Sequence, residues 1–167
     1  MRESPEFTRY AAEKSPRLFK TAYLLCRDRG LAEDLVQITL VKTWRAWRRI
    51  EDDPDPYVYR ILVNSHASSM RRLWRREIPT DEPPEASSED ELSRLDTRAW
   101  ILAALARLPR RQQAVIVLRF FEDMTEPQVA AVLDCSVGTV KSQTSKALAK
   151  LRLDPQVMVP IACERKG

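Results

Sequence analysis

Glycine, histidine and long apolar runs are all scarce in this chain. Its 167 residues include 3 glycines, and its apolar side chains recur at helical spacing without strand-like alternation. This pattern predicts an all-α protein. No segment approaches the roughly 20 apolar residues that a bilayer-spanning helix needs, and the N-terminal residues lack the apolar stretch of a secretory signal. We therefore expect a soluble cytoplasmic protein that does not insert into the membrane.

Metal-ligating and catalytic side chains are equally scarce. The three cysteines, Cys26, Cys135 and Cys163, are far apart and form no CxxC pair, and His66 is the single histidine. A metal cluster or a disulfide framework is therefore not expected. The apolar neighbours of Cys26 and Cys135 predict that both behave as small buried hydrophobic residues. Because the sequence also lacks a nucleophile with a histidine partner and a GxxxxGK loop, we expect no enzymatic activity, no cofactor and no small-molecule substrate.

Charge is distributed in three blocks. The net charge is +5 over residues 1–78, −5 over residues 79–98 and +4 over residues 99–167. Two basic blocks separated by an acidic one are typical of two nucleic-acid-binding domains joined by a linker. The alternative is that these are ordinary solvated surface charges. The positions of the charged residues on the predicted helix faces distinguish the two interpretations. Residues 78–92 (IPTDEPPEASSEDEL) hold three prolines and almost no apolar bulk, which predicts a flexible acidic linker.

Helix-breaking residues divide each block into helices. Gly30 predicts the end of the first helix, the proline-rich loop at 51–56 separates the next two, and Asp154-Pro155 closes the last. The predicted domains are residues 1–77 and 94–153, with the linker at 78–93 and a tail at 154–167. The expected helices span residues 5–27, 31–49 and 56–76 in the first domain and 94–107, 110–121, 126–133 and 137–152 in the second.

A helix-turn-helix is predicted near the C-terminus. Thr125 and Gln128 have the spacing of a capping box, and the short helix that they open ends at a turn over 134–136. The outer face of the next helix is polar and cationic, as in a recognition helix that meets base edges in the major groove. A solvated helix surface is the alternative, and the capped helix in front of it favours DNA recognition. The buried sector should be Val137, Val140, Ala147, Leu148 and Leu151; the outer face is Thr139, Ser142, Gln143, Lys146 and Lys150.

A second candidate surface lies on the helix after Pro56. One side is an apolar stripe that should be buried, including His66 as a core residue. The opposite side is basic, with an asparagine and a neighbouring tryptophan, which suits a DNA strand with unstacked bases better than a merely solvated face. The stripe is Tyr59, Leu62, Val63, His66, Met70 and Leu73; the basic face is Arg60, Asn64, Ser68, Arg71 and Arg75, flanked by Arg72 and Arg76.

A third candidate surface lies on the helix over 31–49. We expect one stripe to be buried in the domain core, and a second face that mixes aliphatic and polar groups to remain exposed. A helix that packs only against the core of its own domain normally has an outer side of polar residues. The mixed face therefore suits binding to a protein partner. The buried stripe is predicted to be Val36, Leu40, Trp44 and Trp47, and the mixed face to be Asp34, Gln37, Ile38, Val41 and Arg45.

Three segments resemble a known family. AEDLVQITLVKTW (32–44) resembles the core-polymerase-binding segment of sigma-70-type factors, and YVYRILVNSHASSMRR (57–72) resembles their promoter-melting and minus-10-reading segment. Residues 108–152, which contain GTVKS, are similar to their minus-35-binding domain. The order and spacing resemble the extracytoplasmic-function (ECF) sigma factors, which keep only region 2, a three-helix-type bundle, and region 4, a helix-turn-helix domain. Within them the chain resembles the actinobacterial SigE-like group.

The resemblance implies a sigma factor that brings promoter recognition to core RNA polymerase. It implies contacts with the β′ clamp and the β flap of the polymerase and with promoter DNA, and it leaves open whether an anti-sigma factor binds. The loop over 50–56, with Tyr57 and Asn64, would hold a flipped minus-10 base. The implied clamp contacts are Asp34, Gln37, Ile38 and Val41; the minus-10 contacts are Tyr57, Arg60, Asn64, Arg71, Arg72 and Arg75; the minus-35 contacts are Thr139, Lys141, Ser142, Gln143 and Lys146.

Four positions depart from the family pattern. Ile38 stands where an acid is usual, so part of the clamp contact would be apolar. Thr144 replaces a large aliphatic residue and Gln143 replaces a long base, which implies looser packing of the recognition helix and an unusual promoter preference. Asp134 replaces a turn glycine, and aspartate tolerates a left-handed φ at some cost.

Two other classes of protein compete with this interpretation. A stand-alone regulator would use the helix-turn-helix as a dimer on a palindrome, and an interaction module would sequester a partner. A simple repressor needs no second basic face on an unrelated helical domain, so the N-terminal block favours a sigma factor.

Overall fold

The described part of the chain is built from helices. The computed structural model describes residues 4–75 and 95–153, and every regular element in these ranges is helical, which confirms the all-α prediction. The N-terminal half comprises α1 (Pro5–Cys26), α2 (Arg29–Ala46), the short 3-10 helix η1 (Trp47–Arg49) and α3 (Asp55–Arg75). The C-terminal half comprises α4 (Leu95–Ala106), α5 (Arg110–Ile116), the π turn η3 (Val117–Phe121), α6 (Glu126–Leu133) and α7 (Val137–Leu153). The predicted linker, the tail with Cys163, and Arg76 lie outside the described residues.

The first helix boundary differs from the prediction. α1 ends at Cys26, and Arg27 caps it with a left-handed φ of 58°. Asp28 then opens α2, because its carboxylate accepts a hydrogen bond from the Leu31 backbone N–H at 2.8 Å. Gly30 lies inside the first turn of α2 with a negative φ, so the prediction that it ends the first helix is wrong. The aspartate cap starts the second helix before the glycine is reached.

The buried face of α2 also differs from the predicted stripe. Trp44, expected in the core, is 38% exposed. Two threonines take part in the core instead: the Thr39 hydroxyl donates to the Leu35 carbonyl at 2.7 Å, and the Thr43 hydroxyl donates to the Thr39 carbonyl at 2.8 Å. Because these bonds satisfy the hydroxyls, threonine can be buried here without an unpaired polar group. The buried residues of α2 are Ala32, Leu35, Val36, Thr39, Thr43 and Ala46.

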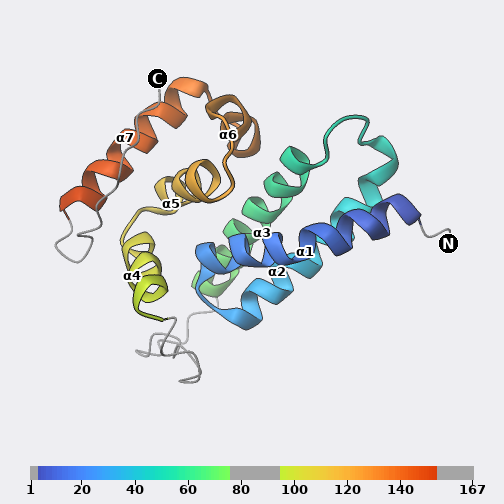
Figure 1. The fold of residues 1–167 in the computed structure, drawn as a ribbon, viewed down its shortest axis with the longest axis horizontal. Coiled ribbons are helices and arrows are strands. Elements are labelled where there is room, and N and C mark those ends of the chain that lie inside the picture. Colours follow the sequence, from blue (N-terminus) through green and yellow to red (C-terminus); the bar gives the residue numbers. More distant parts are fainter. Residues whose placement is uncertain (1–3, 76–94, 154–167) are drawn as a thin grey trace.

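The two halves share their hydrophobic cores. In Figure 1 α6 lies beside α3, and α4 lies beside α1. One buried cluster combines residues of both halves, and the second joins Leu24 and Leu25 of α1 to residues of the C-terminal half. The sequence predicted two domains with modest cores of their own, whereas the structure packs them against each other. The first cluster includes Leu18, Leu35, Val58 and Leu62 from the N-terminal half and Val115, Leu118, Val129, Val132 and Val140 from the C-terminal half.

Cys26 and Cys135 are free thiols that pack against the first core cluster, as their apolar neighbours predict, although each is only half-buried. Burial raises the pKa of the Cys26 thiol, which also donates to the Asp28 carbonyl at 3.3 Å. Among the helices that the structure describes, none is long and apolar enough to cross a membrane.

Candidate nucleic-acid interface

The helix-turn-helix forms as the sequence predicts. The Thr125 hydroxyl accepts from the Gln128 N–H at 3.3 Å, and the Gln128 side-chain oxygen accepts from the Thr125 N–H at 2.8 Å, which completes the capping box. α6 ends at Asp134, which adopts a left-handed φ of 52°. Ser136 then opens α7 by accepting from the Thr139 N–H at 3.0 Å. Local hydrogen bonds therefore fix where α6 and α7 begin.

The outer face of α7 is available to a partner. Val140 and Ala147 are buried, and the other residues of the predicted inner sector are half-buried. Two outer residues already have partners: the Thr139 hydroxyl is 2.9 Å from that of Ser136, and Lys141 Nζ is 3.8 Å from the Glu126 carboxylate. Thr139 thus helps to fix the turn. The exposed outer residues are Lys141, Ser142, Lys146 and Lys150, while Thr139 and Gln143 are half-buried.

The basic face of α3 is exposed as predicted, and its apolar stripe is buried only in part. Tyr59, Leu62 and His66 are buried, which confirms His66 as a core residue. Burial lowers the pKa of His66 to about 4, helped by the nearby charges of Arg110 and Arg27. Leu73 is 56% exposed, so the stripe prediction is wrong at that position: among the residues after His66 whose burial is described in α3, none is buried. The exposed polar residues of this face are Arg60, Asn64, Arg71, Arg72 and Arg75; Ser68 is half-buried.

Arg60 connects α3 to the helix-turn-helix. Its Nη2 lies 3.7 Å from the Asp134 carboxylate, in the turn between α6 and α7. Both side chains are exposed, and an exposed pair of this kind contributes at most about 1 kcal/mol. The ion pair therefore shows that Arg60 lies next to the helix-turn-helix, but it contributes little to the stability of the fold.

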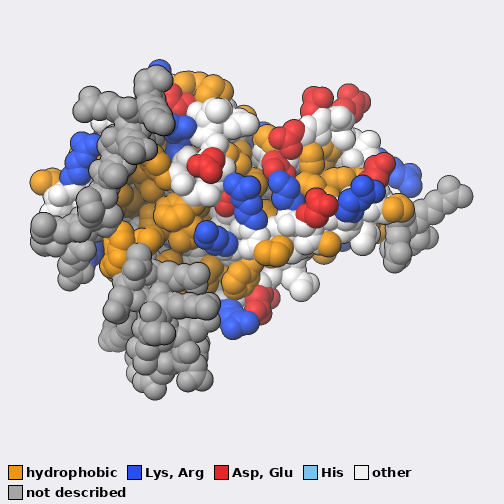
Figure 2. Space-filling model, in the orientation of Figure 1, with side chains coloured by type: hydrophobic (Ala, Val, Ile, Leu, Met, Phe, Trp, Pro, Cys, Tyr) orange, Lys and Arg blue, Asp and Glu red, His pale blue; other side chains and the backbone are white. Residues whose placement is uncertain are grey.

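The loop between η1 and α3 is acidic. It carries Glu51, Asp52 and Asp53, all exposed, and no Lys or Arg. In Figure 2 red acidic side chains gather over this loop, and blue basic side chains lie next to it along α1. An acidic loop repels phosphates, so it can meet DNA only through an uncharged group such as a base. The neighbouring Tyr57 is 40% exposed at the start of α3.

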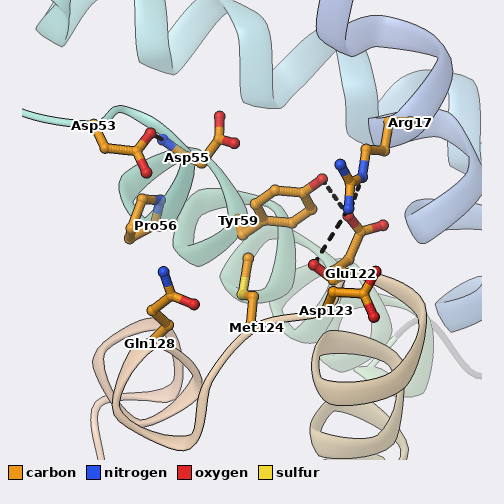
Figure 3. Close-up of a pocket in the computed structure, with 9 residues that line it drawn as sticks. All are labelled: Arg17, Asp53, Asp55, Pro56, Tyr59, Glu122, Asp123, Met124 and Gln128. Carbon is orange, nitrogen blue, oxygen red and sulfur yellow. Dashed lines mark hydrogen bonds and ion pairs between the residues drawn. The ribbon is translucent and has the colours of Figure 1, made fainter.

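A small polar cavity of about 150 Å³ lies beside this loop (Figure 3). Residues from both halves of the chain line it. On its N-terminal side, Asp55 is held by the Tyr10 hydroxyl at 2.8 Å and by Lys14 Nζ at 2.6 Å. The cavity is not lined by Tyr57 or Asn64, which the family resemblance assigns to a base pocket here. The lining residues are Arg17, Asp53, Asp55, Pro56, Tyr59, Glu122, Asp123, Met124 and Gln128.

Glu122 is a buried acid that sequence reasoning missed. It is 7% exposed, and its carboxylate accepts hydrogen bonds from Arg17 Nε at 2.6 Å, from the Tyr59 hydroxyl at 2.7 Å and from the Thr21 hydroxyl. Burial, followed by the bond to Glu122, raises the pKa of Tyr59, so this hydroxyl remains a donor. The charge of Glu122 raises the pKa of Arg17. Nothing in the local sequence FFEDM distinguishes this glutamate from a surface acid.

The mixed face of α2 is exposed, as predicted. Asp34 and Gln37 lie on the surface, Ile38 is 39% exposed and Val41 is 48% exposed. Trp44 extends this face by one turn. An apolar patch ringed by polar groups is typical of a protein-binding surface.

Comparison with known proteins identifies the family. Residues 11–76 match the family model for Sigma-70 region 2, and residues 98–151 match that for Sigma-70, region 4. RNA polymerase sigma-E factor of Streptomyces coelicolor is 36% identical over 154 residues, which cover 91% of this chain and 87% of that protein. The chain belongs to the sigma-70 family of RNA polymerase sigma factors. ECF RNA polymerase sigma factor SigL of Mycobacterium tuberculosis is 32% identical to this sigma factor over 146 residues. The aligned region covers 83% of this chain and 82% of SigL. The resemblance to ECF sigma factors of the SigE type is confirmed.

Two solved sigma-factor structures share the fold. The sigma factor RpoE in complex with the anti-sigma factor NepR from Bartonella quintana has a TM-score of 0.73 and 26% identity, over 90% of this chain and 99% of that one. CnrH in complex with the cytosolic domain of CnrY has a TM-score of 0.64 and 29% identity, over 87% and 84% of the two chains. Region 2 of this sigma factor corresponds to α1–α3 and region 4 to α4–α7. Because each superposition covers both regions, the similarity extends to the arrangement of region 4 relative to region 2.

Proposed function

We propose that this sigma factor binds core RNA polymerase, melts the minus-10 element with region 2 and reads the minus-35 element with region 4. The observation that carries this proposal is the presence of two separate basic helix faces, on α3 and on α7, in one chain. The proposed division is region 2 over 1–77, a linker over 78–93, region 4 over 94–153 and a tail. We further propose that the protein is non-catalytic and acts in the cytoplasm, where it meets the polymerase.

The polymerase contact is assigned to α2. Asp34 and Gln37 would offer polar contacts to the β′ clamp, while Ile38 and Val41 would bury apolar surface there. The exposure of both aliphatic residues supports this assignment, since solvated helix faces gain nothing from them. Region 4 would meet the β flap.

The minus-10 contact is assigned to α3. Arginines there would neutralise phosphates, and an asparagine and a tyrosine would recognise an unstacked base. The acidic loop before α3 would exclude phosphate and accept only a base, which suits a strand that is opened. The proposed residues are Tyr57, Arg60, Asn64, Arg71, Arg72 and Arg75.

The minus-35 contact is assigned to the N-terminal half of α7. A recognition helix presents such residues to base edges of the duplex. Exposed lysines and a serine support this role, and Thr139 would hold the turn while it contacts DNA. The proposed residues are Thr139, Lys141, Ser142, Gln143 and Lys146.

An anti-sigma factor is a further proposed partner. The solved RpoE chain is bound to one, and its arrangement of regions is similar to the arrangement here. Arg60 on the polar face of α3 lies 3.7 Å from Asp134 in the turn before α7, so a partner that keeps the two regions together would hold the face of α3 against region 4.

Transcription with core polymerase tests the proposed function. The chain is mixed with core polymerase and a fragmented genomic library, and the 5′ ends of the transcripts are sequenced. We expect start sites that share two upstream elements and that are absent without the chain. A free homodimer that binds a palindrome tightly, with no specific start sites, would instead identify a stand-alone regulator.

A further inference from the structure

The first turns of α1 contact the elements at both ends of the acidic loop that precedes α3. The ring centroids of Phe7 and Trp47 are 5.3 Å apart in an edge-to-face arrangement, and those of Tyr10 and Trp47 are 5.2 Å apart. Trp47 begins η1, which leads into the loop, and Asp55 begins α3, which follows it. The Tyr10 hydroxyl donates to the Asp55 carboxylate at 2.8 Å. One tyrosine therefore contacts the element before the loop and the element after it.

Lys14 adds an ion pair to this contact. One turn after Tyr10 on α1, its Nζ lies 2.6 Å from the second oxygen of the Asp55 carboxylate and 6.0 Å from the centre of the Tyr10 ring. The side chains of Lys14 and Asp55 are 26% and 27% exposed, so solvent screens this pair less than it screens a fully exposed one. Burial, followed by the hydrogen bond to Asp55, raises the pKa of Tyr10, so its hydroxyl remains a donor. We refer to Tyr10, Lys14 and Asp55 together as the loop brace.

The loop needs support from outside because its own charges repel each other. Residues 50–56 contain four acidic residues and no Lys or Arg, and Glu51, Asp52 and Asp53 are exposed. Exposed side chains bury little surface that could offset the entropy lost when the backbone is ordered. The Asp53 carboxylate accepts from the Asp55 N–H at 3.0 Å, so the position of Asp55 also determines where Asp53 lies. Figure 3 shows these two side chains next to each other where the loop meets α3.

A loop that recognises a base has to hold one conformation before the base arrives. Binding groups need to lie within about 0.5 Å of their productive positions, and neighbouring residues have to lock them there. Tyr57, the proposed base-reading residue, is 40% exposed in the first turn of α3, two residues after Asp55. The brace side chains bond to each other and are half-buried, so they are placed to fix this turn rather than to bind a base.

We propose that the loop brace positions the loop over 50–56 for selective recognition of the minus-10 base. Tyr10 and Lys14 are positioning residues, because they hold Asp55 and touch no base themselves. Without them the loop populates other conformations. The correct base then loses its contacts, while the other bases, which do not fit the loop, lose little. This inference rests on the proposed function, because it requires region 2 to read the minus-10 element.

Transcription by core polymerase with the full chain tests the brace. The template is one promoter identified for the wild type, made as a set of single-base variants that covers the minus-10 and minus-35 elements. Tyr10→Phe removes the hydroxyl that donates to Asp55 and keeps the ring on Trp47. A hydrogen bond to a charged group contributes about tenfold or more to an equilibrium constant, and apparent affinity follows the competent fraction. We expect the preference for the correct base at one minus-10 position to fall by up to about tenfold, and the preferences in the minus-35 element to stay unchanged.

Tyr23→Phe is the matched control. It removes a hydroxyl from the same helix, about 20 Å further along the helix axis, where the ring stacks on Phe19 and not on Trp47. It should transcribe every template as the wild type does. An equal loss of minus-10 preference in Tyr23→Phe would show a general effect of α1 and would overturn the brace.

Lys14→Met removes the cation of the brace and keeps a long side chain. It should lower the preference for the same base as Tyr10→Phe does. A uniform loss over all templates, with a weaker salt dependence, would instead identify Lys14 as a phosphate contact and would overturn its positioning role.

The proposed function and the brace fail in different ways. If the wild type gives no specific transcripts, the proposed function fails and the brace fails with it. If the wild type selects its minus-10 base, and Tyr10→Phe and Lys14→Met keep that selectivity, the brace alone is overturned. A loss of helical content in both variants, measured by circular dichroism, would also overturn the brace, because the contact would then hold the fold and not the loop.

Discussion

The Arg60 guanidinium lies 3.7 Å from the Asp134 carboxylate, so a residue of the proposed minus-10 face contacts the turn of the helix-turn-helix. Each residue of the pair also has a local role. Arg60 belongs to the exposed face of α3, and Asp134 ends α6 with a left-handed φ of 52°. Substitutions at Asp134 can therefore distinguish the contribution of the ion pair to stability from the contribution of the turn geometry.

Asp134→Asn should leave the free energy of unfolding within about 1 kcal/mol of the wild type, because it removes only an exposed ion pair. Asp134→Val should cost more, since a β-branched residue fits a left-handed φ poorly. Urea unfolding followed by circular dichroism measures both. Equal losses for the two variants would mean that the ion pair, and not the turn geometry, is the stabilising feature.

Asp34→Arg combined with Gln37→Ala should weaken binding to core polymerase while leaving the melting temperature nearly unchanged. Both side chains are exposed on α2 and contribute nothing to its buried face. Association with fluorescently labelled core polymerase gives the affinity. Glu33→Ala is the control for a neighbouring exposed acid, whose observed partner is Arg29 on the same helix. Unfolding of the double variant would instead show that this face of α2 stabilises the hydrophobic core of the protein.

Lys146→Ala should relax base discrimination in the upstream element, with a loss of roughly 1–3 kcal/mol at one or two base pairs. Arg75→Ala should weaken binding to all promoters and reduce the salt dependence by about one phosphate contact. Start-site profiling and salt titrations of the polymerase complex distinguish the two. A sequence-specific defect in Arg75→Ala would contradict the assignment of that residue to phosphate.

Acid should destabilise the fold through His66. Its pKa is lowered to about 4 in the folded chain, first by burial and then by Arg110 and Arg27, against 6.5 when unfolded. Between these values the unfolded chain takes up a proton that the folded chain does not. The free energy of unfolding therefore falls as the pH drops from 6.5 to 4, by up to about 1.4 kcal/mol per pH unit.

His66→Gln removes this titration while keeping a polar side chain. Its free energy of unfolding should fall less steeply than that of the wild type between pH 6.5 and pH 4, and the carboxylates common to both proteins cancel in the comparison. Urea unfolding at several pH values provides the measurement. Parallel curves would mean that His66 titrates alike in the folded and unfolded chains.

Local signals predicted the helices and the helix-turn-helix. The capping box of Thr125 and Gln128 needs only residues three apart, and it fixed the start of α6. The exposed mixed face of α2 followed from helical spacing in the same way. Trp44 shows the limit of spacing: its place in the stripe with Val36 and Leu40 predicted burial, but it is exposed, and Thr39 and Thr43, whose hydroxyls bond to backbone carbonyls of the same helix, lie in the core instead. The binding partners of all three candidate faces stay predictions.

Long-range contacts were beyond sequence reasoning. Glu122 meets Arg17, Thr21 and Tyr59 across separations of 105, 101 and 63 residues. A single sequence contains no signal for such pairs, because nothing in the local sequence of either member indicates a partner this far along the chain. The packing of region 4 on region 2 was missed for the same reason, and with it the cavity between them.

The Gln113 side chain caps the last turn of α1 from the other region, which limits how this sigma factor can be recombined. A chimera that grafts a foreign region 4 onto this region 2 would need an amide at the position of Gln113. It would also need an acid opposite Arg17 and Tyr59, or the graft would leave polar groups unpaired at the junction. A domain swap among paralogues therefore changes the promoter preference and the contact between the two regions at the same time. A reporter strain that carries such a swap could not distinguish the two effects.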